Sequence, residues 1–140
     1  MQNVSYKPII ISVIAQAALG ALWYSPILFL HPWIVAQNKT LEAMNSSDPI
    51  PFVINFAYSV AYTLLLAKLL SGGPAKSPTA ACGAKLGAAV SIGFVGLSLA
   101  THYSFLQLSG VVIAVDVAKE VVMGVMTGAI LGAGAKRGEP

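Results

Sequence analysis

The sequence predicts an all-α membrane protein: a four-transmembrane-helix bundle with antiparallel neighbours, forming a single integral membrane domain over residues 1–140. Two observations predict this class. Four apolar runs, each close to the about 20 residues that cross the hydrocarbon core of a bilayer, are separated by polar or proline- and glycine-rich segments. Hydrophobic residues make up 56% of the chain and charged residues only 9%, whereas soluble domains carry about 25% charged residues. We therefore expect the chain to lie in a lipid bilayer.

The predicted spans cover residues 8–30, 51–70, 83–107 and 110–134. The first is longer than the apolar core of a secretory signal peptide, which has about 7–15 residues, so we interpret it as a membrane span. The segment after it is the longest polar one, and in it Leu41–Met44 is a candidate for a short interfacial helix. Only Leu108 and Ser109 separate the last two predicted spans, so these spans are expected to be adjacent and antiparallel.

The basic residues predict an orientation. With four crossings, both termini and the segment between the second and third spans share one side of the membrane. Most basic residues fall on that side and only Lys39 on the other, so the positive-inside rule places both termini in the cytoplasm, with a bacterial inner membrane as the expected location. The residues on the terminal side are Lys7, Lys68, Lys76, Lys85, Lys136 and Arg137. They are scattered singly, so no basic patch for nucleic acid is predicted.

The fourth predicted span carries three charged residues, Asp116, Lys119 and Glu120. A charged side chain at the centre of a span costs roughly 2.5–3.5 kcal/mol on insertion scales, so such residues usually face the bundle, pair with one another or serve a transport path. Their spacing of three and four residues places them on one face of a helix. We interpret them as a stripe that faces the interior.

Polar residues of the other predicted spans lie at a similar depth below the outer end. They form stripes at helical spacing: Ser12, Gln16 and Trp23; Asn55, Tyr58, Ser59 and Tyr62; and Ser91, Ser98 and His102. At 1.5 Å per residue, each span has a polar residue about 6–10 Å deep. The sequence therefore predicts a polar pocket that opens toward the outer face. Its predicted members are Asp116, Lys119, Glu120, His102, Asn55, Trp23, Tyr24 and Ser25.

The sequence is also compatible with purely structural roles for these residues. Buried Asn, Ser and Tyr side chains also hydrogen-bond helices together, and Trp23 and Tyr24 also fit an interfacial aromatic belt. His102 fits a structural partner of Asp116 better than a metal ligand, so we predict no metal site, and nothing in the sequence indicates a cofactor. The charged stripe fits a neutralised structural network as well as a transport path.

Glycines recur at four-residue spacing and predict close helix packing. Gly124, Gly128 and Gly132 form one series in the fourth predicted span, and Gly83 and Gly87 form a shorter one in the third. Small residues at this spacing let two helix backbones approach closely. The contacts fit the interior of the bundle, a homo-oligomer or a larger membrane complex.

The chain resembles a family of small membrane proteins catalogued as domain of unknown function 1761. The resemblance covers nearly the whole chain and rests on Gly20–Pro26 (GALWYSP), the four-span layout, and an apolar-Asp element at 115–116 followed by GAILG at 128–132. It implies the same architecture and no activity. It singles out four residues: Trp23, Tyr24, Pro26 and Asp116.

Three classes of function follow from the sequence. The first is binding or transport of a small solute or proton through the polar pocket, with Asp116 and Glu120 as titrating groups. The second is an accessory or scaffold subunit of a membrane complex, without transport activity. The third is an intramembrane enzyme acting on lipid or quinone; it has the least support, because the sequence contains no HExxH motif, nucleophile elbow or zinc-ligand pair.

Overall fold

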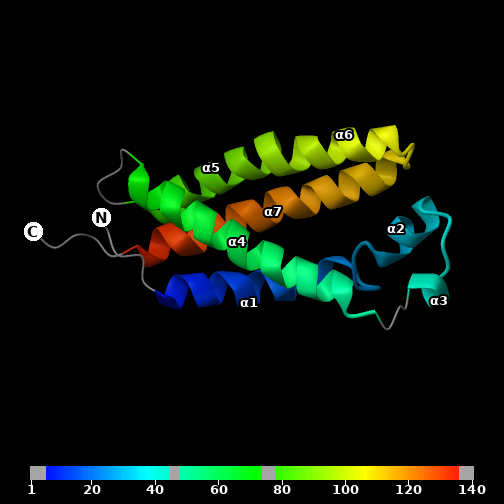
Figure 1. The fold of residues 1–140 in the computed structure, drawn as a ribbon, viewed down its shortest axis with the longest axis horizontal. Helices are drawn as coiled ribbons and strands as arrows, with labels where there is room; N and C mark the ends of the chain where they lie inside the picture. Colours follow the sequence, from blue (N-terminus) through cyan, green and yellow to red (C-terminus); the bar gives the residue numbers. More distant parts are fainter. Residues whose placement is uncertain (1–5, 45–47, 74–77, 136–140) are drawn as a thin grey trace, which may run out of the picture.

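The computed structural model describes residues 6–44, 48–73 and 78–135, which are helical apart from short turns and contain no strand. The long helices lie side by side, and α2 and α3 lie at the end opposite to that where α1 begins and α7 ends (Figure 1). The elements are α1 (Tyr6–Trp23), α2 (Leu30–Ala36), α3 (Leu41–Met44), α4 (Ile50–Gly72), α5 (Ala80–Val90), a π-helical segment η1 (Ser91–Gly96), α6 (Leu97–Phe105) and α7 (Gly110–Gly134).

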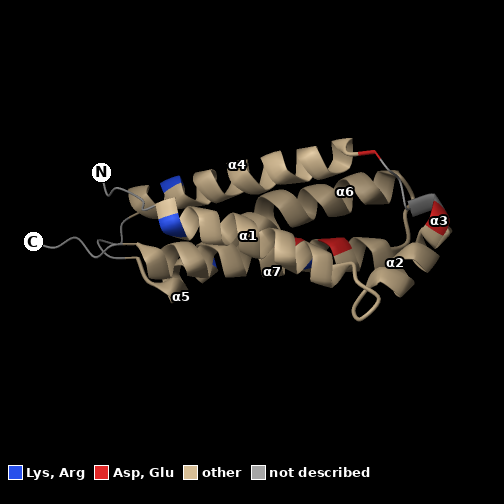
Figure 2. Cartoon of the chain, turned by 90° about the horizontal axis from the view of Figure 1, so that it is seen from below, with Lys and Arg blue, Asp and Glu red and all other residues tan. Residues whose placement is uncertain are grey.

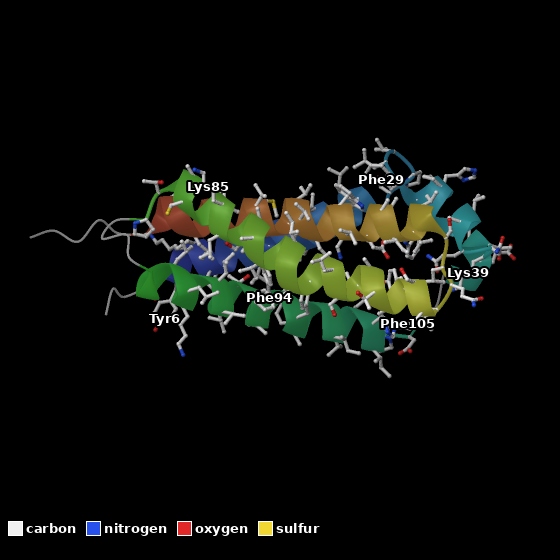
Figure 3. All side chains as sticks on the ribbon, turned by 90° about the horizontal axis from the view of Figure 1, so that it is seen from above. Tyr6, Phe29, Lys39, Lys85, Phe94 and Phe105 are labelled. Atoms are coloured by element: carbon white, nitrogen blue, oxygen red, sulfur yellow. The ribbon has the colours of Figure 1, made fainter. Side chains whose placement is uncertain are left out.

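Three helices of the described chain are long and apolar enough to cross a membrane. They are α1, α4 and the continuous helix Ala80–Phe105, which comprises α5, η1 and α6. Their large apolar side chains point outward, with Phe52 73% and Phe94 79% exposed, and side chains project around the outside of the helices in Figure 3. Apolar surface of this extent is unfavourable in water. The helices are therefore compatible with a location in a lipid bilayer.

The first predicted span, residues 8–30, is not one continuous helix. α1 ends at Trp23, a turn covers residues 24–29, and α2 begins at Leu30. Pro26 explains the break, because a proline disfavours the α conformation in the residue before it and helices usually end there. The turn is closed by the backbone N–H of Phe29, which donates to the carbonyl of Trp23 at 3.1 Å. As a result, α2 folds back to contact α7.

The remaining helices lie close to the predicted spans. α7 has the predicted bounds, and α4 and α5–α6 begin and end within three residues of them. Side-chain caps explain two of the starts: Thr79 Oγ1 accepts from the N–H of Cys82 at 3.2 Å before α5, and Ser109 Oγ accepts from the N–H of Val111 at 3.2 Å before α7. Such caps satisfy N–H groups that lack a partner within the helix. The π-helical segment η1 was not predicted.

Helices α5 and α7 pack backbone against backbone. Gly83 faces the carbonyl of Gly128, and Gly87 faces the carbonyl of Gly124, so closely that a Cβ atom at any of these positions would collide with the opposite backbone. Gly132 lies in the same way against the backbone of Thr79. The glycines singled out in the sequence thus lie between two helices of the same chain.

Helices α1 and α4 complete the packing around α7. At one end of α1, Gly134 lies against the ring of Pro8; at the other, Trp23 Nε1 donates to the carbonyl of Val115 at 3.2 Å. α1 therefore follows α7 over most of its length. Helix α4 contacts α1, α5 and α7. The apolar core lies mainly on α4 and consists of Tyr62, Leu66, Ala67, Leu70 and Leu131.

Candidate functional site

Two carboxylates of α7 are buried inside the molecule. Asp116 is 6% exposed and Glu120 is 4% exposed. The residues lie four apart, so they occupy successive turns of one helix face. The same face buries Val112 and Met123. Figure 2 shows the acidic segment of α7 in the half of the molecule that also contains α2. The fold therefore places both acids in the interior, as the sequence predicts for the charged stripe.

Asp116 is held by the turn that follows α1. Tyr24 is the first residue after α1, and its hydroxyl donates to Asp116 Oδ1 at 2.6 Å. The indole of Trp23 donates to the backbone carbonyl of Val115, the residue before Asp116. The end of α1 and the turn after it therefore contact α7 at two adjacent residues. The hydroxyl of Tyr103, on α6, also interacts with the Asp116 carboxylate. The break in the first predicted span thus places the hydroxyl of Tyr24 against Asp116.

Glu120 has a partner for each carboxylate oxygen. Lys119 Nζ lies 2.6 Å from Oε1, and the hydroxyl of Tyr58, on α4, donates to Oε2 at 2.7 Å. The same ammonium lies 5.8 Å from the centroid of the Tyr24 ring, within the range of a cation–π interaction. Lys119 and Tyr24 therefore connect the two acids. We call Asp116, Lys119, Glu120, Tyr24 and Tyr58 the carboxylate cluster.

The carboxylate cluster has an unbalanced formal charge. With both carboxylates and the ammonium of Lys119 charged and the two phenols neutral, the cluster has a net charge of −1. An uncompensated charge is costly away from water, and hydrogen bonds from phenols offset only part of that cost. One proton bound to either carboxylate makes the cluster neutral.

Four predicted pocket residues are not members of the carboxylate cluster, and one of them, Trp23, contacts the backbone of α7 beside it. His102 and Asn55 are exposed, and the hydroxyl of Ser25 donates to the carbonyl of Leu22 in its own turn at 2.7 Å. The prediction counted depth along each helix, and depth does not fix which way a residue faces. His102 lies on the outward surface of α6, where it lines a shallow depression together with Phe94 and Phe105.

Two tyrosines take the places expected for His102 and Asn55. Tyr58 lies three residues after Asn55, and Tyr103 directly follows His102. Tyr58 belongs to the polar stripe noted in the sequence, and its spacing to Ser59 and Tyr62 was the available signal. Tyr103 had no comparable signal, because its neighbours in α6 form no clear apolar face. Among the described residues, no group of three His, Cys, Asp or Glu side chains could hold a metal ion.

Comparison with known proteins identifies the family. A family model described as "Protein of unknown function (DUF1761)" matches residues 8–132. The chain belongs to this family. The resemblance inferred from the GALWYSP motif is thus confirmed, and the match includes every residue of the carboxylate cluster. No curated protein and no solved structure matches this DUF1761 protein.

Proposed function

We propose that this DUF1761 protein binds a proton or a small solute at the carboxylate cluster and carries it across a membrane. The observation that supports the proposal is that Asp116 and Glu120 are both buried, whereas Lys119 is the one cation that the described residues place in the cluster, where it pairs with Glu120. A purely structural network is most stable when its charges balance. Intramembrane ionisable groups that remain unbalanced are typical of proton and solute paths.

In this proposal α7 is the fourth span of an antiparallel four-helix bundle. It has 25 residues, which at 1.5 Å per residue is about 37 Å and enough to cross a bilayer. It contacts each of the three apolar helices, and its acids face them. The charged residues of α7 are therefore shielded from lipid, which offsets the cost of placing them in the membrane.

The distribution of charge supports cytoplasmic termini. Lys85 lies toward the end where α1 begins, and Lys39 lies at the opposite end (Figure 3). Lys7 is the second residue of α1, and Lys68 lies near the end of α4; basic segments gather at the end where α1 begins (Figure 2). Lys76, Lys136 and Arg137, which contribute to the same predicted bias, lie outside the described residues. Under the positive-inside rule the end with the three described lysines faces the cytoplasm of a bacterial inner membrane. The carboxylate cluster then lies nearer the outer face.

Cys82 tests this orientation directly. It is the single cysteine of the chain, is exposed and is the third residue of α5, at the proposed cytoplasmic end. We expect a membrane-impermeant maleimide to label it in inverted vesicles and not in right-side-out vesicles. As a matched control, a Cys82→Ser/Lys39→Cys variant should show the opposite pattern. Labelling of Cys82 from the outside would reverse the proposed orientation.

A second candidate, an accessory subunit of a membrane complex, is favoured by the surfaces of α4 and α6. Residues 50–57 of α4 are all exposed, and α6 has no buried residue. Helices of a larger assembly, or of a second copy of this chain, could pack against these exposed surfaces. In this case the carboxylate cluster would only hold α1, α4 and α7 together.

Proton flux through the purified protein in liposomes separates the two candidates. We expect Asp116→Asn to lower the flux at least tenfold, because the amide cannot exchange a proton yet can still accept the hydrogen bond from Tyr24. The control is Glu42→Gln, which removes an exposed acid in α3 and should leave the flux unchanged. A wild-type protein that carries no protons, or an Asp116→Asn variant with full flux, would refute proton transport through the cluster.

A further inference from the structure

Three buried polar atoms on α1 and α7 have no hydrogen-bond partner among the described residues. They are Ser12 Oγ and Gln16 Oε1 on α1 and Thr127 Oγ1 on α7. Ser12 and Thr127 are 0% exposed and Gln16 is 3% exposed. Buried polar atoms are almost always satisfied by protein or by internal water, because desolvation without a hydrogen bond is costly. These three atoms therefore point to a polar ligand between the helices.

The hydroxyl groups of Ser12 and Thr127 differ from others in the same protein. Thr63 donates to the carbonyl of Ser59 at 2.8 Å, and Thr101 donates to the carbonyl of Leu97 at 2.8 Å, each within its own helix. This i to i−4 bond is the usual way in which a hydroxyl is satisfied inside a helix. Ser12 and Thr127 do not make it, although they are more deeply buried than Thr101. Their hydroxyls are free to bind a group that lies between α1 and α7.

The contacts along α1 and α7 place the three atoms close to one level. Trp23 on α1 and Val115 on α7 are in contact and give a common starting point. Counted from there at 1.5 Å per residue, Ser12 lies about 17 Å along α1 and Thr127 lies about 17 Å along α7. Gln16 lies one turn from Ser12 on the same face. Its Nε2 donates to Thr63 on α4 at 2.7 Å, which fixes the amide and leaves Oε1 to face another group.

We propose that Ser12, Gln16 and Thr127 bind internal water, which extends the polar path from Glu120 toward the cytoplasmic end and makes the proton the transported species. An internal water needs about 2–4 polar partners, and these atoms supply three. All three are neutral, whereas hard metal cations prefer sites that include carboxylates. Water between closely packed helices passes a proton along its hydrogen bonds but leaves no room for a larger solute. The inference that the proton is the transported species rests on the proposed transport function. The inference that water occupies this site does not.

Radiolytic hydroxyl labelling of the full-length protein in nanodiscs tests the water site. Met123 lies between Glu120 and Thr127 on the buried face and is 5% exposed, so a dry interior would protect it. With internal water beside it, we expect Met123 to be oxidised within about threefold of the rate for the half-buried Met126. Ser12→Ala/Thr127→Val, which removes both hydroxyls with little change of shape, should lower the Met123 rate at least fivefold. Thr101→Val, at an exposed hydroxyl, is the matched control and should leave it unchanged.

The outcomes separate the water site from the transport function. Protection of Met123 in the wild type, or an unchanged rate in the double variant, would overturn the water site. A lower Met123 rate together with at least a tenfold loss of proton flux would support both the site and the proton as substrate. A lower rate with full, Asp116-dependent flux would refute the proton path through this site. If Asp116→Asn leaves the flux unchanged, the transport function fails, while the labelling result still decides the water site.

Discussion

Gly128→Leu is expected to prevent α5 and α7 from packing and to abolish the stable fold. A Cβ atom at this position collides with the backbone carbonyl of Gly83, and a backbone cannot move aside as a side chain can. Overpacking of a core typically costs about 1–3 kcal/mol, and occasionally more. We expect a loss of about 3 kcal/mol or more here, because the two helices would have to separate along their shared face. The measurement is the thermal unfolding midpoint, together with size-exclusion behaviour in detergent.

The matched control for this substitution is Gly20→Leu. Gly20 lies on α1, and a Cβ atom there meets nothing within 4 Å, so a leucine would extend into open space on the outside of the helix. We expect wild-type behaviour from this variant. If Gly128→Leu unfolded at the same temperature as Gly20→Leu, the close contact between α5 and α7 would be wrong.

The row of residues that contains Gly128 also explains how the site is built. Along α7 the row begins with two acids and continues with three glycines. Where the row is glycine, α5 contacts the backbone of α7 directly. Where the row is acidic, its longer side chains occupy the space beside α7. There the neighbouring helix is no longer α5 but α6, which follows it through η1 and has no buried residue. A π-helical segment inserts an extra residue into a helix and shifts the face that follows. The row consists of Asp116, Glu120, Gly124, Gly128 and Gly132.

Much of this fold could be predicted because the spans and close contacts depend on local sequence. The length and composition of an apolar run indicate a membrane helix without knowledge of its neighbours, and the predicted bounds of α4 agree with the structure to within two residues. Glycines at four-residue spacing indicate a close helix contact for the same reason. The sequence could not say whether that contact lay within the chain, because homo-oligomers use the same pattern.

The members of the site were harder to predict because they depend on how each helix is rotated. Asp116 was correctly expected in the interior, since a charge rarely faces lipid. His102 and Asn55 were expected in the pocket from their depth along the chain but lie on exposed faces. Polar side chains near the end of a span tolerate the membrane surface, so their presence does not fix the direction in which the helix face points. Tyr103 became visible only once α6 and α7 were placed together.

Lys119→Met is expected to be the most destabilising change within the carboxylate cluster. The lysine side chain is 16% exposed and its Nζ lies 2.6 Å from Glu120 Oε1. Its removal would leave two buried carboxylates without a cation, and breaking a buried ion pair by removing one partner typically costs about 3–5 kcal/mol. Lys85→Met, at an exposed lysine of α5, should cost little. The measurement is the free energy of unfolding in detergent at neutral pH.

A double variant distinguishes charge balance from lost packing. Lys119→Met/Glu120→Gln removes the cation and one carboxylate together, and the glutamine can still accept the hydrogen bond from Tyr58. We expect this variant to recover most of the stability lost in Lys119→Met, because the cluster returns to a formal charge of −1. If the double variant were as unstable as Lys119→Met, the lysine would act through its aliphatic chain. Recovery would instead show that Lys119 stabilises the protein through its charge, by limiting the unbalanced negative charge at this site to one.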